Sequence, residues 1–102
     1  MDTNVSINNS QAVICLEGRF DFNAHREFRE AVDKAMQADG VKEIQVDLSK
    51  VPYLDSSALG MLLMLRDKAL GRGRSVQLTQ CKGSVRQVLE IANFGKLFSI
   101  AR

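Results

Sequence analysis

The chain has 102 residues, 45% of them hydrophobic and 25% charged, which is typical of a soluble globular protein with one domain spanning residues 1–102. Fourteen Lys and Arg against twelve Asp and Glu leave a formal charge of +2, too small for nucleic-acid binding by electrostatics. No apolar run approaches the roughly 18–20 residues that cross a bilayer, and the first residues lack the features of a signal peptide. We therefore expect a cytoplasmic protein that binds neither nucleic acid nor membrane.

Residues suited to catalysis or metal binding are sparse. The single histidine, His25, excludes a two-histidine metal site, and its polar neighbours predict a solvated helix residue. Cys15 and Cys81 belong to no C-x-x-C pair, so we expect two small apolar fillers in a reduced protein. No phosphate-binding glycine motif is present, and the Gly-Arg-Gly-Arg run at 71–74 follows a helix, which predicts a turn. The sequence predicts no enzyme, no catalytic residue, no metal site and no cofactor.

The first half of the chain predicts a hairpin, a helix and a strand. Short apolar runs at 5–7 and 12–16 flank a polar turn, the pattern of two antiparallel strands. From Asn23 the apolar residues recur every three to four positions, which predicts an amphipathic helix of about four turns ending at Asp39 and Gly40. Alternating apolar and polar residues then predict a strand over 41–48.

The second half continues with helices and strands in turn. A helix from residue 55 or 56 to Leu70 ends at the glycines of 71–73, and a strand follows at 76–79. We expect a third helix over 84–93 and a last short strand over 97–101. This order predicts an α/β fold: a mixed, mostly parallel β-sheet of four to five strands with helices packed on it and an antiparallel hairpin at its start.

Three polar residues, Asp55, Ser56 and Ser57, stand directly before an apolar helix. Their short oxygens suit the capping of unpaired first-turn N–H groups, which is the ordinary interpretation. A cap needs only one such oxygen, however, and a phosphate is also well tolerated at a helix N-terminus. Phosphorylation there would add about −1.5 to −2 charges to the surrounding surface.

Six of the seven residues from 59 to 65 are apolar, without the usual polar interruption. At about 100° per residue, we predict that the face formed by Leu59, Leu62, Arg66 and Ala69 packs on the sheet. Met61 and Met64 would then be exposed, on a stripe that also carries Ser57, Gly60 and Lys68. Exposed methionines beside a small glycine form an adaptable surface for another protein. The alternative is that a neighbouring loop covers them.

A longer pattern surrounds these residues. Residues 47–60 match D-L-S-x-V-x-x-[LM]-D-S-[ST]-x-L-G, and residues 18–21 match the turn G-x-[ILF]-D. With these motifs the chain resembles the STAS family, specifically its small stand-alone members, the anti-sigma factor antagonists of bacteria. The predicted order of strands and helices agrees with that family over residues 5–100.

The resemblance implies a partner-switching protein. In such families an ATP-dependent serine kinase, often itself an anti-sigma factor of GHKL type, phosphorylates the serine directly after the aspartate, and a PP2C-type phosphatase removes the phosphate. By position the acceptor is Ser56, with Ser57 as the runner-up because helical geometry alone does not separate the two. Asp21 and Asp55 match acidic positions near the acceptor. Arg19 stands where acidic residues are frequent, which leaves the identity of the kinase open.

Ala58 stands where many members have glycine, and alanine, a better helix former, should be tolerated there. The expected function is that of an anti-sigma factor antagonist, which binds the kinase when unphosphorylated and is released by phosphorylation of Ser56. The expected partner-binding residues are Asp21, Asp55, Ser57, Gly60, Met61 and Met64. One competing hypothesis is a nucleotide- or anion-binding α/β regulatory domain that uses the same helix N-terminus. Another is a structural subunit of a larger assembly, whose serines are never modified.

Overall fold

The computed structural model describes residues 1–100, with Ser99 described through its backbone alone. Its strands form one sheet in the order β1-β2-β3-β4-β5, in which β1 is antiparallel to β2 and all other neighbours are parallel. The elements are β1 (Asp2–Asn8), β2 (Gln11–Glu17), η1 (Phe22–Ala24), α1 (His25–Gln37), β3 (Glu43–Lys50), α2 (Ser56–Leu70), β4 (Ser75–Thr79), α3 (Gly83–Ile91), η2 (Phe94–Lys96) and β5 (Ser99–Ile100).

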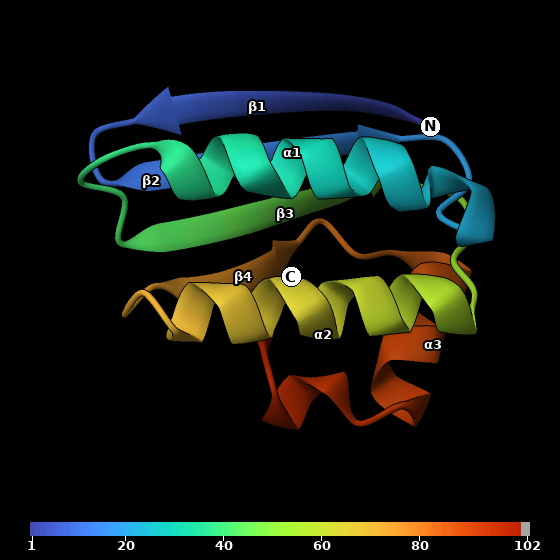
Figure 1. The fold of residues 1–102 in the computed structure, drawn as a ribbon. Helices are drawn as coiled ribbons and strands as arrows, with labels where there is room; N and C mark the ends of the chain where they lie inside the picture. Colours follow the sequence, from blue (N-terminus) through green and yellow to red (C-terminus); the bar gives the residue numbers. More distant parts are fainter. Residues whose placement is uncertain (101–102) are drawn as a thin grey trace.

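The core lies between one face of the sheet and the helices, and α1 and α2 run side by side across that face (Figure 1). Strands β2, β3 and β4 alternate buried apolar residues with half-buried residues, as period-2 strands with one covered face do. The opposite face carries a ladder of polar side chains. Its hydrogen bonds join Gln11 to Glu43 at 2.8 Å, Gln45 to Glu43 at 3.1 Å and Gln45 to Gln77 at 3.1 Å.

The predicted fold class is confirmed, with shifts at the ends of elements. A short 3-10 helix, η1, precedes α1, because Asp21 caps it separately by accepting a hydrogen bond from the Asn23 N–H at 3.0 Å. The third strand begins and ends two residues later than expected. The strand predicted at 97–101 is shorter in the structure, where β5 covers Ser99–Ile100. Residue 101 lies outside the described residues.

The predicted orientation of α2 is wrong. The residues that α2 buries are Ala58, Met61, Leu62, Leu65 and Ala69. Leu59 is only partly buried, and Arg66 lies at the edge, where its Nε donates to the Leu97 carbonyl oxygen at 2.8 Å. A charged guanidinium at the centre of the core face would have been costly to desolvate. Met61, which we expected to be exposed, is 5% exposed and belongs to the core.

The C-terminal end of α1 is held by arginines from the turn after α2. Arg74, which is 9% exposed, donates to the carbonyl oxygens of Ala35 at 3.2 Å, Met36 at 3.0 Å and Ala38 at 2.9 Å. Arg72 also donates to Met36 O, at 2.7 Å. These carbonyls would otherwise lack partners at a helix end. The turn at 71–74 is therefore confirmed, and its arginines join α1 to the α2–β4 connection.

Candidate functional site

At the start of α2, the residue that caps the helix is the aspartate and not one of the two serines that follow it. Asp55 is the N-cap in an extended conformation, and its side chain accepts a hydrogen bond from the Ala58 N–H at 3.0 Å. Ser56 is the first helical residue and is exposed, whereas Ser57 is half-buried. The structure thus distinguishes two serines that helical geometry alone left equivalent, and Ser56 is the more accessible.

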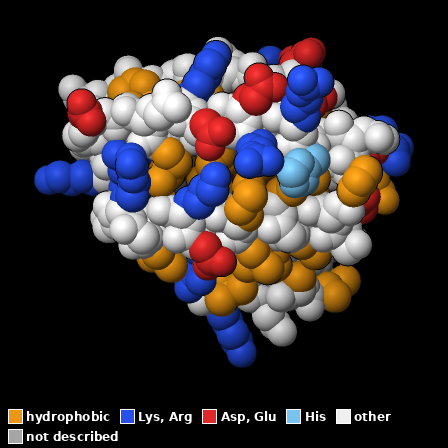
Figure 2. All heavy atoms as spheres, viewed as in Figure 1, with side chains coloured by type: hydrophobic (Ala, Val, Ile, Leu, Met, Phe, Trp, Pro, Cys, Tyr) orange, Lys and Arg blue, Asp and Glu red, His pale blue; other side chains and the backbone are white. Residues whose placement is uncertain are grey.

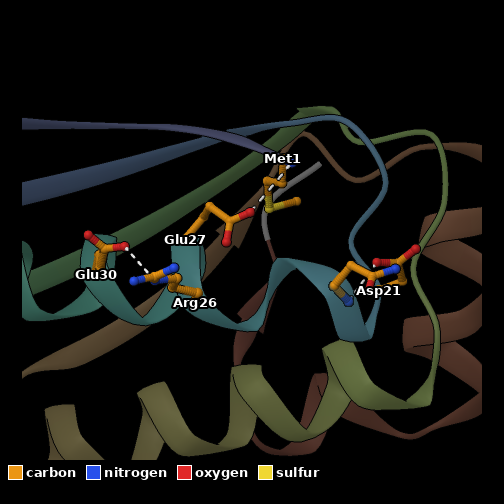
Figure 3. A network of polar contacts seen from close by, with 6 residues as sticks. Met1, Asp21, Arg26, Glu27 and Glu30 are labelled. Carbon is orange, nitrogen blue, oxygen red and sulfur yellow. Dashed lines mark hydrogen bonds and ion pairs between the residues drawn. The ribbon is translucent and has the colours of Figure 1, made fainter.

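A pair of backbone hydrogen bonds places the Gly18–Asp21 turn beside this helix start. Phe20 and Leu54 form an isolated parallel bridge, in which the Phe20 N–H donates to Tyr53 O at 3.0 Å and the Asp55 N–H donates to Phe20 O at 3.3 Å. Asp21 therefore lies next to Asp55, and Figure 3 shows it where the chain enters η1, close to the beginning of α2. The two aspartates, expected near the acceptor, are thus brought together, and each caps a different helix.

The outer face of α2 is apolar around the exposed serine. Gly60, one turn after Ser56, is exposed, and a Cβ built on it meets no atom within 4 Å. The side chains that flank Ser56 and Gly60 on this face are apolar and partly buried: Leu59, Leu63 and Met64. Figure 2 shows the contrast: charged side chains lie over α1, while hydrophobic side chains gather over and below α2. Of the two methionines expected on this surface, only Met64 remains partly exposed.

Two residues of this region, Phe22 and Tyr53, were missed by sequence reasoning, and so was the contact that Arg19 makes with one of them. Phe22 is 72% exposed in η1, and Tyr53 is 41% exposed just before Asp55. The Arg19 guanidinium lies 4.4 Å from the centre of the Tyr53 ring and 3.5 Å from the Asp21 carboxylate. The sequence did offer a signal for Phe22, because it is a second phenylalanine placed directly after the G-x-F-D turn, where polar residues are usual.

The remaining polar candidates do not form a site. His25 is exposed at the start of α1. Burial raises the pKa of the Cys81 thiol, and burial together with the Asp47 carboxylate raises the pKa of Cys15, so both thiols are held neutral. Within residues 1–100, no group of His, Cys, Asp or Glu has the arrangement needed to hold a metal ion. The helices of the same range are also too short or too polar to cross a bilayer.

A family model described as the Mlab-type STAS domain matches residues 3–99, and the chain belongs to the STAS domain family. A STAS-domain containing protein of Pseudomonas aeruginosa is 45% identical over 96 residues, which cover 94% of this chain and 93% of that protein. The family resemblance found in the two motifs is therefore confirmed.

Solved structures agree on the fold. An anti-sigma factor antagonist from Mycobacterium paratuberculosis superposes with a TM-score of 0.86 at 21% identity, covering 98% of this chain and 84% of that one. The Bacillus cell fate determinant SpoIIAA in its phosphorylated form gives a TM-score of 0.73 at 20% identity, covering 99% and 92%. At these identities the likeness establishes the fold alone.

Proposed function

We propose that the chain is an anti-sigma factor antagonist that changes partners when Ser56 is phosphorylated. In the unphosphorylated state the surface around the start of α2 binds an anti-sigma factor that is also a serine kinase of GHKL type. Phosphorylation releases this partner, and a PP2C-type phosphatase restores the binding form. The kinase supplies the ATP and the catalytic groups in the cytoplasm, whereas this chain supplies the acceptor hydroxyl and the docking surface. The phosphorylated form of SpoIIAA, which shares the fold, supports the proposal.

The observation that carries the proposal is that cap and acceptor are different residues. Asp55 satisfies the Ala58 N–H, so the exposed Ser56 hydroxyl is free to accept a phosphate without loss of the cap. The first-turn N–H groups and the positive end of the helix dipole tolerate an anion at this position. Phosphorylation can therefore change the surface while the helix and the fold stay intact.

In the transfer, a bond forms between Ser56 Oγ and the γ-phosphorus of ATP while the bond from that phosphorus to the ADP oxygen breaks. The hydroxyl proton passes to a base of the kinase. The product carries about −1.5 to −2 additional charges beside Asp21 and Asp55 and next to the apolar outer face of α2. A partner packed on this surface would have to desolvate that charge, at a cost on the order of several kcal/mol, and each ~1.4 kcal/mol is a factor of ten in affinity.

Direct binding of a nucleotide or free phosphate at the same helix start is less well supported. The Asp55 carboxylate already accepts the Ala58 N–H, and Asp21 adds a second acidic side chain beside it. A free anion would meet both carboxylates, whereas covalent transfer is driven by ATP and does not require favourable binding. A thermal-shift titration with ATP, GTP and inorganic phosphate should leave the melting temperature unchanged, and stabilisation by mass action would favour the binding hypothesis instead.

The test compares three variants against the kinase identified by a pull-down with Ser56→Ala as bait. Ser56→Ala should bind that kinase constitutively, and Ser56→Asp should bind at least about tenfold more weakly, since each ~1.4 kcal/mol of lost complementarity is tenfold. Ser57→Ala is the matched control for the acceptor, and because its Ser56 is intact it should still be phosphorylated by the kinase. Mass-spectrometric mapping after incubation with kinase and ATP should place the phosphate on Ser56. Equal affinities of Ser56→Ala and Ser56→Asp would contradict the proposal.

A further inference from the structure

Two aromatic side chains remain exposed next to the proposed phosphoacceptor. Phe22 is 72% exposed and Tyr53 is 41% exposed, although most of the large apolar residues of this chain are buried. We call Phe22 and Tyr53 the aromatic pair. Figure 2 shows hydrophobic side chains at the right-hand end of the face, where η1 and the start of α2 lie in Figure 1. Apolar residues scattered singly over a surface are ordinary, whereas neighbouring ones form a patch of the kind that marks an interaction site.

The backbone fixes the aromatic pair close to Ser56. Phe22 lies two residues after Phe20, and Ser56 lies two residues after Leu54, the bridge partner of Phe20. With about 3.8 Å between consecutive Cα atoms and about 5 Å between paired strands, the Cα atoms of Phe22 and Ser56 lie within about 20 Å of each other. Tyr53 is three residues before Ser56 and on the same side of the bridge as Arg19. The backbone therefore keeps both aromatic residues within about 20 Å of the acceptor.

Tyr53 is also held in place before any partner arrives. The Arg19 guanidinium lies over its ring at 4.4 Å, and the same guanidinium is 3.5 Å from the Asp21 carboxylate, which in turn caps η1. This arrangement restricts the ring at low cost, because the Arg19 side chain is itself positioned by an ion pair. An aromatic side chain ordered in advance loses less entropy on binding, which is what an interface anchor requires.

We propose that the aromatic pair anchors the serine kinase that phosphorylates Ser56, an inference that rests on the proposed function. The identity of the binding partner follows from the chemistry of phosphoryl transfer. The γ-phosphate of ATP must come within bonding distance of Ser56 Oγ, so the kinase must cover the surface around this serine. A standard interface buries about 800 Å² on each partner, a patch of about 16 Å radius, which is wide enough to hold Ser56 and both aromatic residues together. Aromatic residues at the centre of such a patch are typical binding anchors.

The experiment measures steady-state phosphorylation of Ser56 by a soluble extract of the native cell supplied with ATP, with the phosphate quantified by mass spectrometry. Phe22→Ala and Tyr53→Ala should each raise the KM for the chain about tenfold or more while kcat stays unchanged, because an anchor supplies binding in ground state and transition state alike. The matched control is Ile91→Ala, which removes an 83% exposed apolar side chain from α3 and should behave like the unmodified chain. Thermal unfolding should remain within a few degrees for Phe22→Ala, since little buried area is lost.

The outcomes separate this inference from the proposed function. Phosphate on Ser56 with the same KM in Phe22→Ala, Tyr53→Ala and Ile91→Ala would overturn the aromatic anchor alone. A loss confined to kcat would also overturn it, because the rings would then act on the chemical step. Absence of phosphate from Ser56 of the unmodified chain would overturn the proposed function and the anchor together. Loss of self-association in Phe22→Ala, with KM unchanged, would assign the aromatic pair to a second copy of the chain instead.

Discussion

Gly60→Ala should stabilise the folded chain and weaken partner binding at the same time. Gly60 lies in the interior of α2, and the added methyl group would meet no atom of the chain within 4 Å. Replacing glycine by alanine at an unstrained helical position lowers the conformational entropy of the unfolded chain, a gain of about 0.5–1 kcal/mol. For a chain of 102 residues, 1 kcal/mol corresponds to a rise in Tm of about 4–8 °C.

The binding effect has the opposite sign because Gly60 lies one turn from Ser56 on the proposed docking surface. A methyl group added where a partner packs closely costs about 1–3 kcal/mol, or roughly fivefold to 150-fold in affinity. Asp67→Ala is the matched control: Asp67 is exposed farther along α2, and its replacement also improves helix propensity. Differential scanning calorimetry and titration with the kinase measure the two effects. A lower Tm for Gly60→Ala would refute the open environment of Gly60, and unchanged affinity would remove this residue from the docking surface.

Three further sets of substitutions test the cap, the arginines and the buried thiol. Asp55→Ala should lose about 1 kcal/mol of stability with its hydrogen bond to the Ala58 N–H, whereas Asp55→Asn should retain most of it, as measured by urea unfolding. Arg74→Met should lose about 2–3 kcal/mol because it removes three hydrogen bonds to carbonyl oxygens, of which only the one to Met36 O is backed by a second donor, Arg72. Arg72→Ala, which removes one hydrogen bond, should lose about 1 kcal/mol, and similar losses in the two variants would contradict the central role of Arg74. Because burial raises the pKa of the Cys81 thiol in the folded chain, the stability it contributes is present below the unfolded pKa of about 8.5 and is lost as the pH rises. Cys81→Ala should therefore show a smaller loss of stability between pH 8 and 10 than the unmodified chain in urea titrations.

The sequence predicts best the helices and strands in which apolar residues recur with one regular period. Strand β3 alternates buried and half-buried residues, and α1 separates an apolar face from a charged one, so the type of each element follows from local pattern. Helix α2 does not follow in this way because apolar residues occupy both its inner and its outer face. In the structure the small side chains of Ala58 and Ala69 lie on its buried face together with Met61, Leu62 and Leu65. The burial of Met61 follows from that packing and not from its spacing.

The features that the sequence did not predict depend on contacts between segments far apart in the chain. The Phe20–Leu54 bridge joins residues 34 positions apart, and no local pattern encodes it. The proximity of Asp21 to Asp55 could therefore be expected only from the family resemblance. Arg74 was read as part of a turn because its acceptors are carbonyl oxygens 36 to 39 residues away in the sequence. Every residue carries a backbone carbonyl oxygen, so the amino-acid sequence does not show which ones accept a hydrogen bond from a distant arginine.

The apolar outer face of α2 also bears on how a single phosphate could act as a switch. Between exposed charged groups in water, two further negative charges are screened and change affinity little. Between apolar surfaces that exclude water, the same charges must be desolvated, and the penalty grows to several kcal/mol. Leu59, Leu63 and Met64 beside Ser56 provide such surroundings, whereas the outer face of α1 is charged. The same serine placed at the start of α1 would face a partner across a polar surface and would switch it weakly.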